Sequence, residues 1–283
     1  MSKILEFFGE SSQGLTKAGI EEKLHNQICP YTKNRCFKVR KSEPEISIGT
    51  CLVKYGKEDK NIIICPHRLL QNKQVFVDSI HLLTQHEPGN EFHVVSEIAI
   101  PGGSVDYILV SAKNGKVKDF LGIEFQTLDT TGTIWPERER MLDEHGIKVN
   151  SNAVNATKPF GMNWKMTAKT ILVQLHHKID TFEHISKHLV LAIQDCLLDY
   201  MKKEFNFDHL SEPSKVGDSM HIHSYLIKNE NTIYKIELDR RLSTDSEGMA
   251  RCLGLQAETK IELEEIIRNI ESKLSDNSLF SIV

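Results

Sequence analysis

The sequence contains no long uninterrupted apolar segment. A helix that spans a membrane needs roughly 20 apolar residues, and no run of even about 18 occurs in this chain. The N-terminal stretch MSKILEFFGE also lacks the apolar region of a secretion signal. We therefore expect a cytoplasmic protein with no membrane partner.

Internal repeats and low-complexity linkers are also absent, so the 283 residues would form one large domain or a domain with a small module. We expect an N-terminal module over residues 1–86 and a core over residues 87–283. Three strands with turn sequences between them are predicted at 92–100, 104–111 and 117–128. The other expected segments are helices at 13–26, 67–85, 166–200 and 257–274, strands at 46–53, 61–65, 220–228 and 232–238, and a polar stretch at 129–159. For the 166–200 segment, a break of the helix near His188 is left open. This order predicts an α/β (α+β) fold in which helices flank a mixed sheet.

Acidic residues are missing from one long segment, although the chain is acidic overall with a net charge of −4. Residues 145–179 hold five lysines and no acid, and residues 33–73 hold ten Lys or Arg against four acids. Segregated charge suits a polyanion such as double-stranded DNA that contacts one face, and chance clustering on solvated surfaces is the alternative. Lys and Asn side chains of the acid-free segment are candidates for contacts with phosphates and base edges: Lys148, Asn155, Lys158, Asn163, Lys165 and Lys169.

Several histidines fall on predicted elements. They are His176, His177, His184 and His188 on a predicted helix and His221 and His223 on a predicted strand. Helical spacing of three or four residues suits a metal, but no acid or cysteine accompanies them in a known pattern. We interpret these histidines as surface or DNA-facing side chains.

Two acids and an amide are expected to converge on neighbouring strands. Side chains alternate between the faces of a strand, so Glu124 and Gln126 share one face while the apolar residues between and before them face the core. Asp106 lies on the preceding strand of the same hairpin. Two adjacent carboxylates with open positions for water and phosphate suit Mg²⁺, which can activate water and stabilise charge on a phosphodiester. The alternative is that Glu124 pairs with a lysine on a solvated sheet face.

Four of the six cysteines, Cys29, Cys36, Cys51 and Cys65, lie within 37 residues. In a cytosolic protein such a cluster favours a bound metal over disulfides. The spacing of six, fourteen and thirteen intervening residues differs from the CxxC pairs of common zinc ribbons, so spacing alone leaves the site open. Four thiolates can hold zinc or iron, and a closed site of this kind would be structural.

The catalytic pattern resembles a known nuclease superfamily. An acid on one strand followed by Glu124-x-Gln126 on the next is similar to PD-(D/E)xK nucleases, and the surrounding sequence resembles the NotI-like restriction endonucleases, whose motif ends in Gln. The resemblance implies that Asp106 and Glu124 bind Mg²⁺. It also implies that Gln126 replaces the usual lysine and orients the attacking water or touches the scissile phosphate. Glu97, on the first strand of the meander, is a candidate further acid, with a surface salt bridge as the alternative.

The N-terminal segment resembles the same family. Its members begin with Phe-Phe-Gly, matched here by Phe7-Phe8-Gly9, and continue with Cys-Pro, Gly-x-Cys and Cys-Pro-x-Arg-x-Leu. The corresponding residues here are 29–30, 49–51 and 65–70. The family binds one iron through four cysteines ahead of the nuclease core, so the resemblance implies an iron or zinc site at the four clustered cysteines, of which Cys36 is matched least well.

These features predict a type II restriction endonuclease that makes site-specific, Mg²⁺-dependent double-strand cuts in DNA by phosphodiester hydrolysis. Symmetric cutting implies a homodimer, and a restriction-modification system implies a cognate DNA methyltransferase. One competing function is that of a repair or modification-dependent nuclease on the same core. The other is a non-catalytic DNA-binding module that uses the four cysteines.

Overall fold

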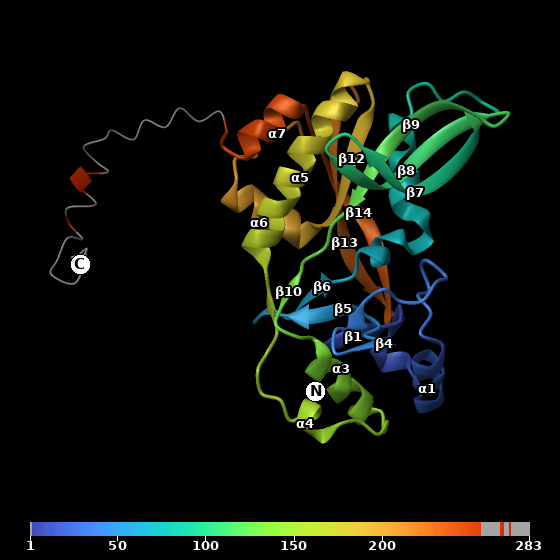
Figure 1. Ribbon diagram of the computed structural model, residues 1–283, viewed down its shortest axis with the longest axis vertical. Helices are drawn as coiled ribbons and strands as arrows, with labels where there is room; N and C mark the ends of the chain where they lie inside the picture. Colours follow the sequence, from blue (N-terminus) through green and yellow to red (C-terminus); the bar gives the residue numbers. More distant parts are fainter. Residues whose placement is uncertain (1, 256–266, 269–271, 273–283) are drawn as a thin grey trace, which may run out of the picture.

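A six-stranded mixed sheet forms the centre of the computed structural model, which describes residues 2–255, 267, 268 and 272 (Figure 1). Its strand order is β14-β13-β12-β9-β8-β7. The strands are β7 (Glu91–Ile100), β8 (Gly103–Lys113), β9 (Lys116–Phe125), β12 (His188–Gln194), β13 (Met220–Glu230) and β14 (Ile233–Thr244). Strands β7, β8 and β9 form the antiparallel meander that the sequence predicts, and β12 is parallel to both β9 and β13. The expected mixed sheet is thus confirmed, whereas most of the helix predicted at 257–274 lies outside the described residues.

Strand β12 is the main departure from the sequence-based elements. The sequence indicates helical periodicity over 166–200 and leaves open a break near His188. The chain forms α5 (Trp164–His184), then strand β12 from His188, then α6 (Asp195–Glu204). Almost every residue of β12 is buried, because this strand is central and parallel and both of its faces are covered. A short run that is apolar throughout has no periodicity that separates a strand from a buried helix.

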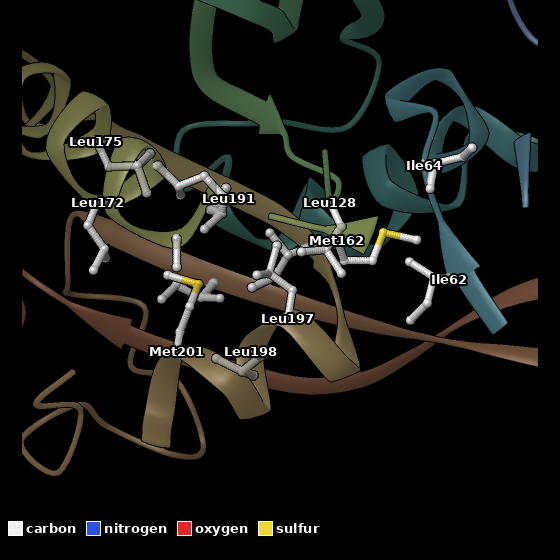
Figure 2. Packing of buried hydrophobic residues seen from close by; sticks show 14 of the residues in the cluster. Ile62, Ile64, Leu128, Met162, Leu172, Leu175, Leu191, Leu197, Leu198 and Met201 are labelled. Atoms are coloured by element: carbon white, nitrogen blue, oxygen red, sulfur yellow. The ribbon is translucent and has the colours of Figure 1, made fainter. Parts of the chain in front are cut away.

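Helices cover both faces of the sheet. On one face, α5 and α6 pack through Leu172, Leu175, Leu197 and Met201 against residues such as Leu191 of β12 (Figure 2). On the other face lie three short helices, η2 (Pro66–Lys73), α2 (Gln74–Ser79) and η3 (Ile80–Leu82). The sequence predicted one helix over 67–85, but Asn72 and Lys73 adopt positive φ angles of 53° and 56°, which interrupt it.

The N-terminal segment forms a smaller sheet with the order β2-β1-β5-β6. Its strands are β1 (Ile4–Phe7), β2 (Glu10–Ser11), β5 (Thr50–Tyr55) and β6 (Lys60–Ile63). Beside it lie the short helix η1 (Ser12–Gly14), helix α1 (Lys17–Asn26) and the hairpin of β3 (Val39–Arg40) and β4 (Glu43–Ser47). Helix α1 begins where the hydroxyl of Thr16 accepts a hydrogen bond from the backbone N–H of Gly19, which satisfies one of the free donors at the helix start.

The segment at 129–159, interpreted from sequence as a polar stretch, contains the helix α3 (Trp135–Glu144). Three of its charged residues, Glu137, Arg138 and Glu139, are buried and paired: Arg138 with Glu139, and Glu137 with the half-buried Arg140, both at 2.6 Å. The segment also holds α4 (Ser151–Val154) and β10 (Thr130–Thr131), which pairs with β11 (Gly161–Met162). The last helix of the continuous range 2–255 is α7 (Ser246–Cys252). Among the described residues, no helix is long and apolar enough to cross a membrane.

Buried histidines occupy the end of the sheet where β12 and β13 begin. His221 and His223 are fully buried on β13, and the ring centroids of His221 and His188 lie 5.2 Å apart. The interpretation of His221 and His223 as surface or DNA-facing residues is therefore wrong, and His188 begins a strand rather than lying in a helix. Burial lowers the pKa of His221 to about 4, with a smaller contribution from His188, and burial also lowers the pKa of His223.

We expect the free energy of unfolding to decrease as the pH falls below about 6.5, the ordinary pKa of histidine. His221 stays neutral in the folded protein between pH 6.5 and about 4, whereas its unfolded form binds a proton, so acid favours the unfolded state. At about 1.4 kcal/mol per pH unit, this residue accounts for about 2 kcal/mol at pH 5. Urea unfolding at pH 7 and pH 5 measures the effect.

The variant His221→Gln should lose less stability on acidification than the wild type. His25→Gln removes an exposed histidine and should retain the wild-type pH dependence. Equal losses for the wild type and His221→Gln would contradict the assignment.

Candidate functional site

Asp106 and Glu124 lie side by side on the hairpin of β8 and β9. Tyr107 pairs with Ile123, so the next position along this register brings Asp106 opposite Glu124. Oδ2 of Asp106 accepts a hydrogen bond from the backbone N–H of Phe125 at 2.8 Å, which fixes this carboxylate against β9. The two acids predicted from the sequence are therefore neighbours in space.

The opposite face of β9 is apolar, as the alternation of side chains predicts. Leu121, Ile123 and Phe125 belong to the core cluster beneath η2 and α2, and the Phe125 ring lies 6.0 Å from that of Phe76. The face that carries Glu124 and the core face of this strand are thus separated by its pleat.

Gln126 follows the last residue of β9 and is half-buried. Its backbone N–H donates to the carbonyl oxygen of Ala192 at 3.1 Å, which continues the pairing with β12 beyond the end of the strand. The amide therefore lies at the carboxyl end of the strand that carries Glu124.

Glu97 is exposed on β7, directly across from Asp106. Ser96 pairs with Tyr107 and Ile98 with Val105, and Glu97 between them has a positive φ of 56°. Burial is the largest cause that raises the pKa of Asp106, and the negative charge of Glu97 adds to it. The structure thus places Glu97 within electrostatic reach of Asp106.

Glu124 has a buried cation beside it. Nζ of Lys178, on α5, donates to Oε1 of Glu124 at 2.7 Å, and the side chains are only 10% and 4% exposed. Glu124 does pair with a lysine, but inside the protein and not on a solvated face. Burial, together with a smaller contribution from the charge of Asp106, raises the pKa of Glu124 to about 7 against the opposing hydrogen bond from Lys178.

Sequence reasoning placed Lys178 among the basic residues of the acid-free segment and missed this role. A signal was present: Ile171, Leu175 and Phe182 form the buried stripe of α5, and Lys178 occupies a position on the same stripe. A single lysine in an apolar stripe indicates a buried partner.

The predicted DNA contacts lie on the loop before α5 and on its first turns. Lys148, Asn155, Lys158, Lys165 and Lys169 are exposed. Asn163 is half-buried at the N-terminus of α5, where its backbone N–H donates to the carbonyl oxygen of Asp129 and its side chain forms no cap. These side chains are separate from Lys178, which points into the protein.

The four cysteines predicted to bind a metal are all buried and reduced. The thiols of Cys51 and Cys65 are hydrogen-bonded, which lowers the pKa of Cys65 to about 6 and raises that of Cys51. Cys29 is hydrogen-bonded to His67, and Cys36 lies within electrostatic reach of Cys65 and Cys29. Within the described ranges no group of three or more His, Cys, Asp or Glu has metal-binding geometry, although the chemistry of four thiols suits zinc or iron.

The N-terminal motifs pack against one another around these cysteines. Arg68 is fully buried and donates to Oε2 of Glu6 at 2.7 Å, so the last motif is joined to the residue before Phe7-Phe8-Gly9. A Cβ at Gly49 would collide with the ring of Phe8, and one at Gly9 would collide with Pro30. Glycine is therefore required for close approach at both positions, where φ is also +74°.

A mixed sheet with helices on both faces, and paired carboxylates at the end of its hairpin, is compatible with a nuclease-like fold. Residues 21–217 match the family described as restriction endonuclease NotI. Because the match covers more than half of the sequence, the chain belongs to the NotI restriction endonuclease family, whose members are type II restriction endonucleases and hydrolyse DNA. The resemblance drawn from the motifs is confirmed at this level. No curated protein matches the chain.

Proposed function

We propose that this chain makes site-specific double-strand cuts in DNA by Mg²⁺-dependent phosphodiester hydrolysis at Asp106, Glu124 and Gln126, on a PD-(D/E)xK core. The observation that carries the proposal is the pair of neighbouring carboxylates on β8 and β9, with Gln126 at the end of the same strand. Digestion of a plasmid with purified protein and Mg²⁺, followed by run-off sequencing, tests it. Defined ends that recur at one short sequence would support it, and intact plasmid at every Mg²⁺ concentration would contradict it.

Asp106 and Glu124 would hold Mg²⁺, which, when bound, lowers the pKa of a water molecule and stabilises negative charge on the phosphate. The hydrogen bond from the N–H of Phe125 fixes one carboxylate for this role. Gln126 is neutral and would orient the attacking water or contact the phosphate through its amide. Glu97 is proposed as a further acid of the site, since its charge already acts on Asp106.

We also propose that Cys29, Cys36, Cys51 and Cys65 bind one iron or zinc ion as a structural site in an N-terminal module over residues 1–86. The proposal is supported by four buried thiols that form no disulfide and that interact electrostatically with one another.

The biological setting that fits the proposed reaction is a cytoplasmic restriction-modification system. A homodimer would match a symmetric DNA site, and a cognate methyltransferase would protect the host sequence. A repair or modification-dependent nuclease would instead cut at lesions or only at modified bases. A non-catalytic DNA-binding module would bind DNA and leave it intact with Mg²⁺ present.

The exposed lysines before and at the start of α5 should contact DNA phosphates. We expect Lys158→Ala and Lys165→Ala to weaken DNA binding and to reduce the salt slope by about one counterion for each lysine–phosphate pair removed. Fluorescence anisotropy over a range of salt concentrations measures both quantities. Lys203→Ala, which removes an exposed lysine of α6, is the control and should leave the slope unchanged.

Asn163→Ala should act differently, by relaxing or abolishing sequence choice. A bidentate contact to a base edge contributes about 1–3 kcal/mol of discrimination. Competition between cognate and scrambled duplexes measures the loss. Crosslinks confined to residues 205–283, with none at 145–179, would show that DNA binds a different surface.

A further inference from the structure

We propose that Lys178 contacts the phosphate that is cleaved and supplies the positive charge that Gln126 lacks. The inference rests on the proposed function, because it takes Asp106 and Glu124 as the centre of the reaction. It adds a residue from helix α5 to a site otherwise built from the hairpin of β8 and β9.

Lys178 is held within the acidic pair itself. Its ammonium donates to Glu124 at 2.7 Å, and its charge also acts on Asp106. The motif position two residues after Glu124 carries an amide, so no cation is available from β9 at that point. Lys178 therefore brings a cation from a different element to the same pair of acids.

The turn between β7 and β8 allows the helix to come this close. A Cβ at Gly102 would collide with the backbone carbonyl oxygen of His177, and a Cβ at Gly103 would lie 3.3 Å from Cε of Lys178. Gly102 thus lets α5 approach the start of β8, and the end of the Lys178 side chain lies beside Gly103. This neighbourhood brings the ammonium close to the strand that carries Asp106.

A cation at this place would stabilise the transition state of hydrolysis in addition to Mg²⁺. The water oxygen bonds to phosphorus as one P–O ester bond breaks, a proton of the water passes to the leaving oxygen, and negative charge grows on the phosphate oxygens in between. Oε1 of Glu124 takes one of the three N–H donors of Lys178, which leaves two for a phosphate oxygen. Lys178 keeps its proton throughout and acts by hydrogen bonding to the developing charge.

A matched ion pair elsewhere on the same strand provides the control. Lys187 donates to Asp119 of β9 at 2.6 Å, and those side chains are 16% and 3% exposed. Asp119 lies five residues before Glu124, roughly 16 Å along the strand. The substitutions Lys178→Gln and Lys187→Gln therefore break similar buried pairs, one in the site and one remote from it.

We expect Lys178→Gln to reduce the single-turnover rate of plasmid cleavage by about 100-fold, and Lys187→Gln to reduce it by less than about threefold. Adding Gln126→Lys to the Lys178→Gln protein should recover at least about tenfold of the loss, since it returns a cation to the site. Without divalent metal, Lys178→Gln should bind a duplex containing the cut site about tenfold more weakly, because two acids then face the phosphate, whereas Lys187→Gln should not.

Equal cleavage rates for the two single variants at equal melting temperature would overturn the inference, as would the absence of any recovery with Gln126→Lys. Glu124→Ala separates this failure from failure of the proposed function. If Glu124→Ala is inactive and Lys178→Gln cuts normally, only the role of Lys178 is wrong. If Glu124→Ala cuts normally, the proposed site itself is wrong.

Discussion

Glu124→Ala and Asp106→Ala should each reduce Mg²⁺-dependent DNA cleavage by about 1,000-fold or more while the protein still folds and binds DNA. Each substitution removes a carboxylate from the adjacent pair on β8 and β9, and with it one of two proposed ligands of the catalytic cation. The decrease in electrostatic stabilisation amounts to several kcal/mol, roughly 4 for a 1,000-fold change. Single-turnover cleavage and DNA binding in Ca²⁺ measure the two functions separately.

Asp119→Ala is the matched control for this experiment. Asp119 is also a buried acid of β9 that pairs with a lysine, so its removal disturbs the strand to a similar degree. It leaves unchanged the end of the hairpin that carries Asp106 and Glu124. We expect this variant to lose stability and to retain cleavage once folded. A Glu124→Ala protein that cuts at the wild-type rate would refute the proposed active site.

Cys51→Ser should remove a bound metal and destabilise the N-terminal segment as a unit. We expect purified wild-type protein to carry about one iron or zinc ion per chain, because four thiolates can close one tetrahedral site. Metal binding and folding are coupled at such sites, so loss of one ligand lowers stability by several kcal/mol and exposes residues 1–86 to proteolysis. Elemental analysis, thermal melting and limited proteolysis measure these effects.

Cys196→Ser is the control, because Cys196 lies on α6 outside the cluster and is only partly buried. It should retain the metal and the wild-type melting temperature. Absence of metal in the wild type, together with four thiols that titrate in the native protein, would show that the cluster is not a metal site.

The meander and its acids could be predicted from the sequence because their signals are local. Strands β7, β8 and β9 alternate apolar and polar side chains and are joined by short turns, so the neighbourhood of Asp106 and Glu124 follows from strand geometry alone. The same reasoning predicts the apolar face that carries Phe125.

Elements that depend on distant contacts could not be predicted in this way. Strand β12 is apolar on both faces, so its sequence shows no hydrophobic periodicity that identifies a strand. The sequence of α3 is as polar as that of a loop, because its buried charges are neutralised by ion pairs that only the fold reveals. Lys178 was visible as a break in an apolar stripe, but the identity of its partner, Glu124, depends on how α5 packs on the sheet. The sequence pattern of α5 therefore indicates that Lys178 has a buried partner but does not identify it.

The buried Arg68 has a consequence for the order in which the chain is completed during synthesis. Besides Glu6, its guanidinium donates to the backbone carbonyl oxygen of Tyr234 on β14, and the neighbouring Gln71 contacts the same carbonyl. The ribosome must therefore make more than 230 residues before this arginine acquires all of its acceptors. Until then, the guanidinium lacks one of its hydrogen-bond acceptors, although Glu6 already balances its charge, and such incomplete intermediates are prone to misassembly. Release of the finished strand β14 from the ribosome supplies the last of these acceptors.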